Sequence, residues 1–331
     1  LLAAAVLGSV TAFADGEPAA PPAVQNEAQT ALAPGNTITK GNLTYTVNDD
    51  GQTVTLTNGS SATGSITIPA AVEQDGTSYP VTSVVDFAFQ YCGALESVTF
   101  SGDVGSIGGF AFQYCGALES VTFSGDVGSI GYGAFRNCDA LESVTFSGNV
   151  GSIGDTVFGF CTALENVTFS GNVGNIGSDA FRNCDGLKTV TFSGDVDIIG
   201  SGAFWSCSAL DTVTFSGNAD SIGDYAFYSC DALKTLTFSG DVDSIESNAF
   251  AGCDALKTIY VPASMPKETV QIIRDALDSS RLSDVQIVQP EQPSDPDPDT
   301  PPDPATDPST PSDPSTGTPS APSTGTTSTG S

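Results

Sequence analysis

The stretch Leu95–Gly108, LESVTFSGDVGSIG, decides the fold because close copies of it follow along the chain at intervals of 23 residues. Leucine, phenylalanine and cysteine keep this period without exception, each at its own position in the unit. The cysteines mark it most simply: Cys92, Cys115, Cys138, Cys161, Cys184, Cys207, Cys230 and Cys253. A fixed period of roughly 20–50 residues is the sequence signature of a repeat solenoid.

The first half of the unit predicts a strand and a turn. Val98 and Phe100 are two residues apart and point to one side, whereas Thr99 points to the other. This alternation of β-branched and aromatic residues predicts a short strand. Gly102 and Asp103 then turn the chain, and we expect the aspartate to make an Asx-type hydrogen bond.

The second half of the unit has apolar residues three to four positions apart, which predicts a short helical or 3-10 turn opposite the strand. These residues are Ile107, Ala111, Phe112 and Cys115. Stacking would place the strands in a parallel sheet on the concave side, ~4.8 Å apart. One coil cannot fold alone, because its large side chains supply ~10–15 kcal/mol against ~30 kcal/mol for ordering it. We therefore predict a leucine-rich repeat solenoid that needs capped ends.

The flanking sequence predicts a β-rich N-terminal cap and a C-terminal cap that contains a helix. Leu43–Val47 and Thr53–Leu56 alternate around Asp50-Gly51, which is a strong hairpin signal. At the other end, Ser264 is placed to N-cap a helix that ends near Leu277. A closing strand is expected at Val285–Val288.

The termini differ in composition from the repeats. An apolar run precedes Ala12-Phe13-Ala14, which fits the small-x-small rule for signal-peptidase cleavage and predicts export. Residues 290–331 contain 12 of the 20 prolines and no Lys or Arg, so we expect a disordered linker. The expected organisation is a signal-peptide remnant at 1–14, a low-complexity linker at 15–40, a hairpin cap and degenerate repeat at 41–91, regular repeats at 92–261, a cap at 262–289 and a linker at 290–331.

Charge and composition exclude several classes of function. The chain has 39 acidic and 9 basic residues, a net charge of −30, and would be repelled by nucleic-acid phosphates. It has no histidine, which removes Ser-His-Asp and Cys-His catalysis and every histidine-containing metal site. We expect no catalytic residues, no cofactor and no insertion of the mature region into a membrane.

The eight cysteines recur in identical phase, so we expect a ladder of inward-pointing sulfurs. Eight cysteines in an exported protein ordinarily suggest disulfides. Parallel Cα–Cβ directions, however, hold the Cβ atoms of adjacent coils too far apart for a bridge. We favour free, buried thiols that pack as small apolar groups, and a straight ladder offers no clustered thiolates for a metal.

Two rows of acidic side chains follow the same period. The turn acids Asp103, Asp126, Asp195 and Asp241 alternate with Asn149, Asn172 and Asn218. A carboxylate that an amide can replace indicates hydrogen bonding rather than calcium binding. Glu96, Glu119, Glu142 and Glu165 form a second row, in which we favour carboxylates that splay into solvent over a shared cation or a glycosidase pair.

Two surfaces are candidates for ligand binding. The strands present a uniform row of threonines, of which Thr99 is the first, and a solvated β-surface is the simpler interpretation of it. Aromatic residues that differ between copies lie on the opposite side, where specificity is more easily encoded: Phe87, Tyr91, Phe110, Tyr114, Tyr132, Phe160, Trp205, Tyr225 and Tyr228. The predicted binding residues are Trp205, Tyr225, Tyr228, Phe160 and Tyr132; the alternative is that these rings act as spacers between coils.

The unit Ala-Phe-x-x-Cys-x-x-Leu-x-x-Val resembles the BspA-like, or Treponema-type, leucine-rich repeat of bacterial surface proteins. Ile66–Pro69 followed by Tyr79–Thr82 is similar to that family's entry segment, and the resemblance covers about Leu43 to Gln289. Ser-Gly stands after each strand where the family often has proline. The resemblance implies an extracellular or cell-surface location, adhesion to a host protein or glycoprotein, and no enzyme activity. A passive stalk, or an accessory region of a larger enzyme, remains the alternative.

Overall fold

The computed structural model describes residues 31–290. The predicted signal-peptide remnant at 1–14, the first part of the linker at 15–40, and residues 291–331 of the predicted C-terminal linker lie outside the described residues. Within residues 31–290, no helix combines the length and the apolar character needed to cross a membrane.

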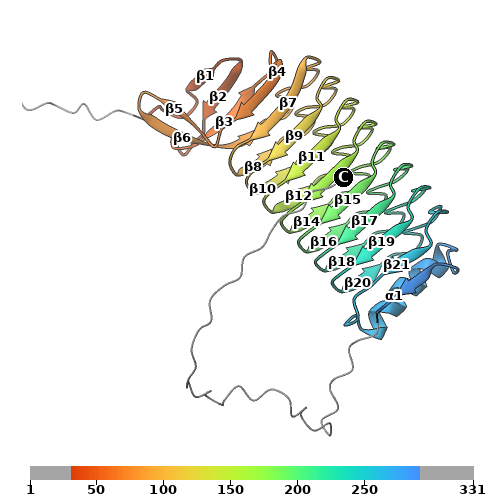
Figure 1. Ribbon diagram of the computed structural model, residues 1–331. Helices are drawn as coiled ribbons and strands as arrows, with labels where there is room; N and C mark the ends of the chain where they lie inside the picture. Colours follow the sequence, from red (N-terminus) through yellow and green to blue (C-terminus); the bar gives the residue numbers. More distant parts are fainter. Residues whose placement is uncertain (1–30, 291–331) are drawn as a thin grey trace, which may run out of the picture. The chain divides into compact units, whose positions relative to one another are not determined.

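Residues 31–290 form a parallel β-solenoid in which each regular coil gives one strand to each of two sheets (Figure 1). The ten-stranded sheet has the order β22(Gln286–Val288), β21(Thr258–Tyr260), β19(Thr235–Phe238), β17(Thr212–Phe215), β15(Thr189–Phe192), β13(Asn166–Phe169), β11(Ser143–Phe146), β9(Ser120–Phe123), β7(Leu95–Phe100), β4(Gly64–Ile68). The twelve-stranded sheet has the order β1(Thr37–Lys40), β2(Leu43–Val47), β3(Val54–Asn58), β6(Thr77–Val84), β8(Val104–Ile107), β10(Val127–Ile130), β12(Val150–Ile153), β14(Val173–Ile176), β16(Val196–Ile199), β18(Ala219–Ile222), β20(Val242–Ile245), with β5(Ala71–Gln74) paired to β6.

The ten-stranded sheet contains the strands that the sequence predicts. Val98 and Phe100 of β7 are buried, and Thr99 between them is half-buried on the outer face. Each strand pairs in parallel with its copy in the next coil, with identical residues side by side, as in Val144 beside Val121. The 23-residue repeat thus sets the register directly, since a slip would move the apolar set to the solvent face.

In the twelve-stranded sheet, β8 and its copies are not predicted as strands by the sequence, which assigns Ile107 to the helical turn instead. In β8 the buried residues are Val104 and Ile107, three positions apart, with Gly105 exposed between them. A strand normally alternates with a period of two, so this spacing imitates a helix. The paired positions of β8 and β10 omit Gly105, and this break in the ladder allows both ends of the short strand to face inward.

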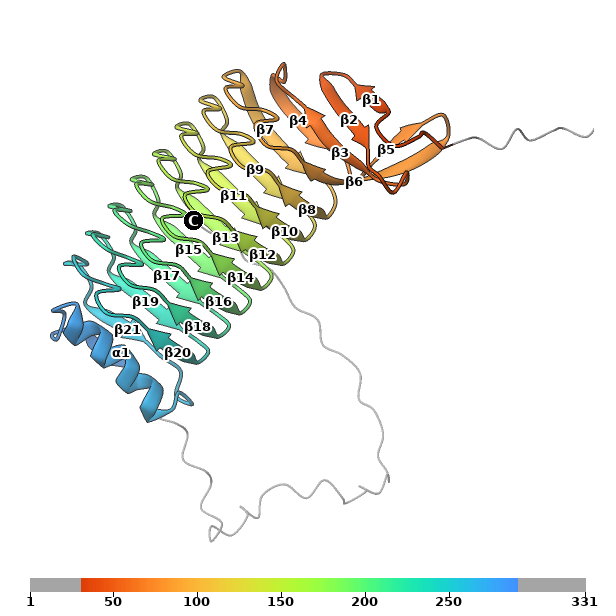
Figure 2. The same cartoon turned by 180° about the vertical axis from the view of Figure 1, so that it is seen from behind.

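The expected helical or 3-10 turns are present only as separate turns, and Figure 2 shows the segments between the two sheets as loops rather than helices. The N–H of Gln113 donates to Phe110 O at 3.1 Å, and the N–H of Cys115 donates to Phe112 O at 3.3 Å. These i→i+3 bonds are of the 3-10 type. They do not continue into a helix because two residues per coil have positive φ, here Phe110 at 55° and Tyr114 at 60°.

The interior is built from columns of identical side chains. Phe112 and Phe135 stack with ring centroids 4.8 Å apart, and Phe100 and Phe123 form a second column at 4.7 Å. The columns meet edge to face, at 6.2 Å between Phe100 and Phe112. Both arrangements are favourable for aromatic rings, so each phenylalanine is held by the coils on either side of it.

The Asp/Asn row bonds between coils rather than within its own turn, which corrects the expected Asx-type bond. Asp103 Oδ1 accepts from the N–H of Asp126 at 2.9 Å, and Asp126 Oδ1 accepts from the N–H of Asn149 at 2.7 Å. Asn149 Oδ1 continues the row by accepting from Asn172 at 3.0 Å. Only the oxygen is used, which explains why the carboxylate and the amide interchange.

The N-terminal cap contains the predicted hairpin of β2 and β3. These strands pair antiparallel, with Tyr45 opposite Leu56. In the connecting turn, Asp50 accepts hydrogen bonds from the Thr53 hydroxyl and from the N–H groups of Gln52 and Thr53. The bond from the Thr53 hydroxyl, followed by the backbone bonds, lowers the pKa of Asp50.

The C-terminal cap consists of the helix α1(Lys267–Ser279) and the closing strand β22, which pairs in parallel with β21. The predicted N-cap, Ser264, is wrong: the helix is preceded by Pro266, with no side-chain cap. Proline disfavours helical dihedrals in the residue before it, so the helix cannot extend back to Ser264. Ile273 and Leu277 of α1 are buried, and the helix covers the end of the stack (Figure 1).

Candidate binding surface

The row of long turns between the two sheets carries all the aromatic residues that the sequence predicts as candidates for binding, and we call it the turn face. It comprises residues 85–94 and the segments that follow at 23-residue intervals as far as 246–255. Two positions in every one of these segments have positive φ, as at Phe87 (61°) and Tyr91 (62°). This conformation suits glycine, and Gly133 and Gly202 occupy it in other coils.

Five aromatic residues form an N-terminal aromatic cluster on the turn face: Phe87, Tyr91, Phe110, Tyr114 and Tyr132. Phe87 stacks on Phe110 at 5.5 Å, Tyr91 stacks on Tyr114 at 5.1 Å, and Tyr132 contacts Phe110 edge to face at 5.1 Å. Their exposure is unusual for rings of this size: 52% for Phe87, 67% for Tyr91, 42% for Tyr114 and 50% for Tyr132. Exposed aromatic rings gathered on three adjacent coils are typical of interaction sites.

Four members of this cluster have left-handed backbone conformations that bulky residues rarely adopt: Phe87, Tyr91, Phe110 and Tyr114. The left-handed conformation costs an L-residue about 1–2 kcal/mol. Burial compensates for this cost only in part, because Phe87, Tyr91 and Tyr114 remain exposed. Because positive φ recurs in every coil, what distinguishes this cluster is that bulky, exposed rings occupy these positions, and this makes it a candidate binding surface.

The predicted residues Trp205, Tyr225 and Tyr228 form a second group, the C-terminal aromatic cluster. Trp205 lies 4.5 Å from Tyr228 and 5.8 Å from Tyr225, and the two tyrosine rings meet edge to face at 5.4 Å. The Arg182 guanidinium lies over the Trp205 ring at 5.0 Å, a cation–π contact. All three aromatic side chains are half-buried.

The other two predicted binding residues do not join this group. Phe160 is half-buried, and the Arg136 guanidinium covers its ring at 5.3 Å. Tyr132 belongs to the N-terminal aromatic cluster through Phe110. The sequence prediction did not select the remaining members of that cluster. Glycine and asparagine at equivalent positions of other copies, such as Gly133 and Asn137, signal a left-handed backbone and would have drawn attention to these aromatic residues.

The eight cysteines are buried and unpaired. Each sulfur donates to a main-chain carbonyl of a preceding coil, as Cys138 Sγ does to Phe112 O at 3.1 Å and Cys161 Sγ to Phe135 O at 3.2 Å. Burial raises the pKa of Cys92 to about 11 and that of Cys207 above its usual range. Neutral thiols of this kind are poor nucleophiles and poor metal ligands.

The acidic rows on the outer surface offer no converging site. Glu96, Glu119 and Glu142 are exposed, and Glu165 pairs with Lys188 at 2.5 Å. Among residues 31–290 no group of three or more Cys, Asp or Glu side chains is placed to hold a metal ion. The carboxylates therefore act as separate solvated charges.

The repeats match the family model described as "BspA type Leucine rich repeat region (6 copies)" over residues 82–211 and 176–290. Among curated proteins, none matches the chain. A leucine-rich repeat protein of T. pallidum is 23% identical, with 73% of this chain and 96% of that chain covered and a TM-score of 0.48.

Two further solved structures are similar to parts of the chain. A leucine-rich cell surface protein of Faecalibacterium prausnitzii is 21% identical over 77% of this chain and 94% of its own, with a TM-score of 0.32. A leucine-rich repeat protein of Bacteroides capillosus is 33% identical over 40% of this chain and 96% of its own, with a TM-score of 0.34. From the family match, which covers more than half of its residues, the chain belongs to the BspA-type leucine-rich repeat family.

Proposed function

We propose that this chain is an extracellular adhesion module whose turn face binds a host protein or glycoprotein. Export is expected from the Ala12-Phe13-Ala14 site, and the membership in a family of bacterial leucine-rich repeat proteins supports display at the cell surface. The observation that carries the proposal is the N-terminal aromatic cluster, in which exposed rings stand on left-handed backbone. Tyrosine, tryptophan and arginine are the side chains most enriched at binding hot spots.

The physical reason for choosing the turn face over the strands is that it breaks the repeat. The outer threonines of the ten-stranded sheet recur unchanged from Thr99 to Thr237, with Tyr260 at the next position, so a ligand would find several equivalent registers along the row. The turn face offers one place with Trp205 and one with Tyr91 beside Tyr114. Aromatic rings also bury more apolar area per contact than threonine methyl groups.

The test uses a substitution that removes the rings and relaxes the backbone together. The double variant Tyr91→Asn and Tyr114→Asn replaces two exposed rings with a residue that tolerates positive φ. We expect adhesion to immobilised matrix proteins and mucin to fall at least tenfold, while the thermal midpoint stays the same or rises. Loss of adhesion therefore cannot be attributed to unfolding.

A second variant, Trp205→Ser with Tyr228→Ser, tests the C-terminal aromatic cluster in the same assay. The matched control replaces two outer strand threonines, Thr122→Ser and Thr145→Ser, which leaves the turn face untouched. Loss of adhesion only in the threonine variant would move the site to the strands. Equal adhesion in all variants would contradict binding through the turn face.

A further inference from the structure

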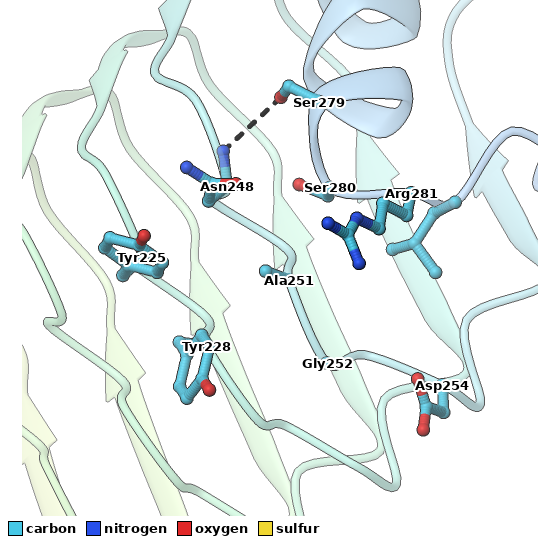
Figure 3. A pocket seen from close by; sticks show the side chains of 10 residues that line it. Tyr225, Tyr228, Asn248, Ala251, Gly252, Asp254, Ser279, Ser280 and Arg281 are labelled. Atoms are coloured by element: carbon cyan, nitrogen blue, oxygen red, sulfur yellow. Dashed lines mark hydrogen bonds between the residues drawn. The ribbon is translucent and has the colours of Figure 1, made fainter.

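A cavity of about 370 Å³ lies between the last regular coil and the end of α1 (Figure 3). Tyr225 and Tyr228 stand on one side of it, and Arg281 stands on the other. Ala251 and Gly252 lie between them, and their small size leaves the space open. The cavity exists because the repeat stops here: no following coil covers these turns, and the end of α1 covers them only in part.

The end of the solenoid leaves the main-chain N–H of Gly252 unused beside this cavity. In the six coils whose long turns begin at Phe87 and end with Ser206, three N–H groups of each long turn donate to carbonyls of the following coil, and in the next coil Phe227 and Ser229 still do so. In the last coil, Asn248 donates instead to Ser279 Oγ and Phe250 to Ser280 Oγ, both at 3.3 Å. The third donor, the N–H of Gly252, has no acceptor among residues 31–290.

A free cation lies on the same cavity. Arg281 is exposed, and it forms no ion pair or side-chain hydrogen bond within residues 31–290. A guanidinium and a main-chain N–H are the donors that most often bind carboxylates, with two parallel bonds from the arginine. Arg281 is one of 9 basic residues in a chain whose net charge is −30. Arg281 and the N–H of Gly252 together favour the binding of an anionic group in this cavity.

We infer that the cavity binds a terminal acidic monosaccharide, a sugar ring that carries one carboxylate, as the end of a glycan. Arg281 and the Gly252 N–H would hold the carboxylate, and Tyr225 and Tyr228 would contact the ring. Asn248 and Asp254 also line the cavity and supply partners for sugar hydroxyls. The volume is at the small end of the ~300–1,000 Å³ typical of ligand pockets, which suits one ring.

The observations favour a sugar over a peptide and one acidic unit over a polyanion. An aspartate or glutamate side chain would satisfy the donors and leave the tyrosine side of the cavity unfilled. A polymer of repeated negative charges would be repelled by the acidic surface around the site. The inference goes beyond the proposed function, because it names a ligand and needs no contact with the N-terminal aromatic cluster.

The experiment compares matched sugars on the purified chain by isothermal titration and saturation-transfer NMR. The probes are 3′-sialyllactose against lactose and methyl glucuronide against methyl glucoside, so each pair differs in the acidic group. We expect an acidic member to bind at least tenfold more tightly than its neutral partner, and the pair that discriminates identifies the kind of acidic sugar. Equal binding within both pairs would overturn the inference.

Variants locate the site. Arg281→Gln should abolish the preference for the acidic sugar, whereas Arg274→Gln, which removes the same charge from α1 outside the cavity, should keep it. Ala251→Phe should fill the cavity and abolish binding with an unchanged thermal midpoint. Retained discrimination in Arg281→Gln, or binding of an acidic peptide in place of both acidic sugars, would refute the assignment.

The two proposals fail separately. If Tyr91→Asn with Tyr114→Asn loses adhesion but keeps sugar binding, both proposals stand. If the same variant keeps adhesion while Arg281→Gln loses sugar discrimination, the sugar site stands and adhesion through the N-terminal aromatic cluster does not. If no acidic sugar binds although the tyrosine variant loses adhesion, only the sugar site falls.

Discussion

Replacing Thr156 by glycine should stabilise the protein, although the side chain belongs to a closely packed long turn. Thr156 has φ of 52°, which is unfavourable for a β-branched residue. Its hydroxyl is buried and has no hydrogen-bond partner within residues 31–290. At the same position of other coils, Gly133 and Gly202 have φ of 59° and 63°, so the turn accepts glycine without a change of backbone.

The magnitude follows from three contributions. Relief of the left-handed conformation is worth about 1–2 kcal/mol, and removal of an unsatisfied buried hydroxyl about 1–3 kcal/mol. The greater freedom of glycine in the unfolded chain opposes these by about 0.5–1 kcal/mol. We expect a net gain of about 2 kcal/mol, which for a folded region of this size raises the thermal midpoint by roughly 4–8 °C.

Urea unfolding followed by circular dichroism measures the gain, with an unchanged m-value as evidence that the denatured state is the same. Thr156→Ala separates the two favourable contributions, because alanine removes the hydroxyl but keeps the strain. As a control, Thr168→Gly in β13 should destabilise by about 0.5–1 kcal/mol, because no strain is relieved in a strand. A Thr156→Gly protein that is less stable than the wild type, like the control, would refute the reasoning.

Four other outcomes are expected. Phe181→Ala should lower the free energy of unfolding by about 3–5 kcal/mol, because a phenylalanine stacks on each side of Phe181 and the substitution leaves a cavity between them. Phe250→Ala should cost less, since only one phenylalanine stacks on Phe250. Equal losses in urea unfolding would contradict a solenoid whose last coil is less stable than its middle. Eight thiols should react with iodoacetamide without reductant in denaturant and almost none in the native state, as intact mass will show. Burial raises the pKa of the Cys92 thiol from 9.0 to about 11, so the stability that the neutral thiol contributes is complete below pH 9 and is lost as the pH rises through 11. The free energy of unfolding of Cys92→Ala should therefore decline less than that of the wild type between pH 9 and pH 11. Asn149→Asp should leave stability nearly unchanged, whereas Asn149→Ala should cost about 1 kcal/mol by removing the acceptor of Asn172.

The part of the fold that the sequence predicts is the part where identical residues touch. A period held by leucine, phenylalanine and cysteine requires that each copy lies beside the next, so the stack and the parallel register of β7 and its copies follow. The caps follow from local signals of another kind, such as Asp50-Gly51 for the hairpin. Pro266 also excludes Ser264 as the start of α1, but only when its effect on the preceding residue is considered.

The sequence does not predict β8 and its copies or the exposure of the aromatic rings, because the spacing of apolar residues does not determine either one. Val104 and Ile107 share the spacing of a helix because the ladder between their strands is interrupted at Gly105. The binding prediction likewise favours Trp205 for its uniqueness, whereas exposure places Tyr91 and Tyr114 in the more accessible cluster. Exposure depends on what packs against each ring, since Phe160 has the same left-handed backbone as Tyr114 but is half-buried beneath Arg136.

Repetition itself limits where this chain can recognise a ligand. Most donors of the long turns in the middle of the array are satisfied by the next coil, so this part of the chain has few unused groups to offer. Unused groups arise where the repeat is interrupted or stops. The rings of Tyr91 and Tyr114 interrupt it on the turn face near the start, and the N–H of Gly252 is left over at its end. Adding a further 23-residue coil before α1 should therefore pair the Gly252 N–H, close the cavity and abolish sugar discrimination while leaving adhesion through Tyr91 and Tyr114 intact. An elongated protein that still discriminates between acidic and neutral sugars would show that the end of the ladder does not create the site.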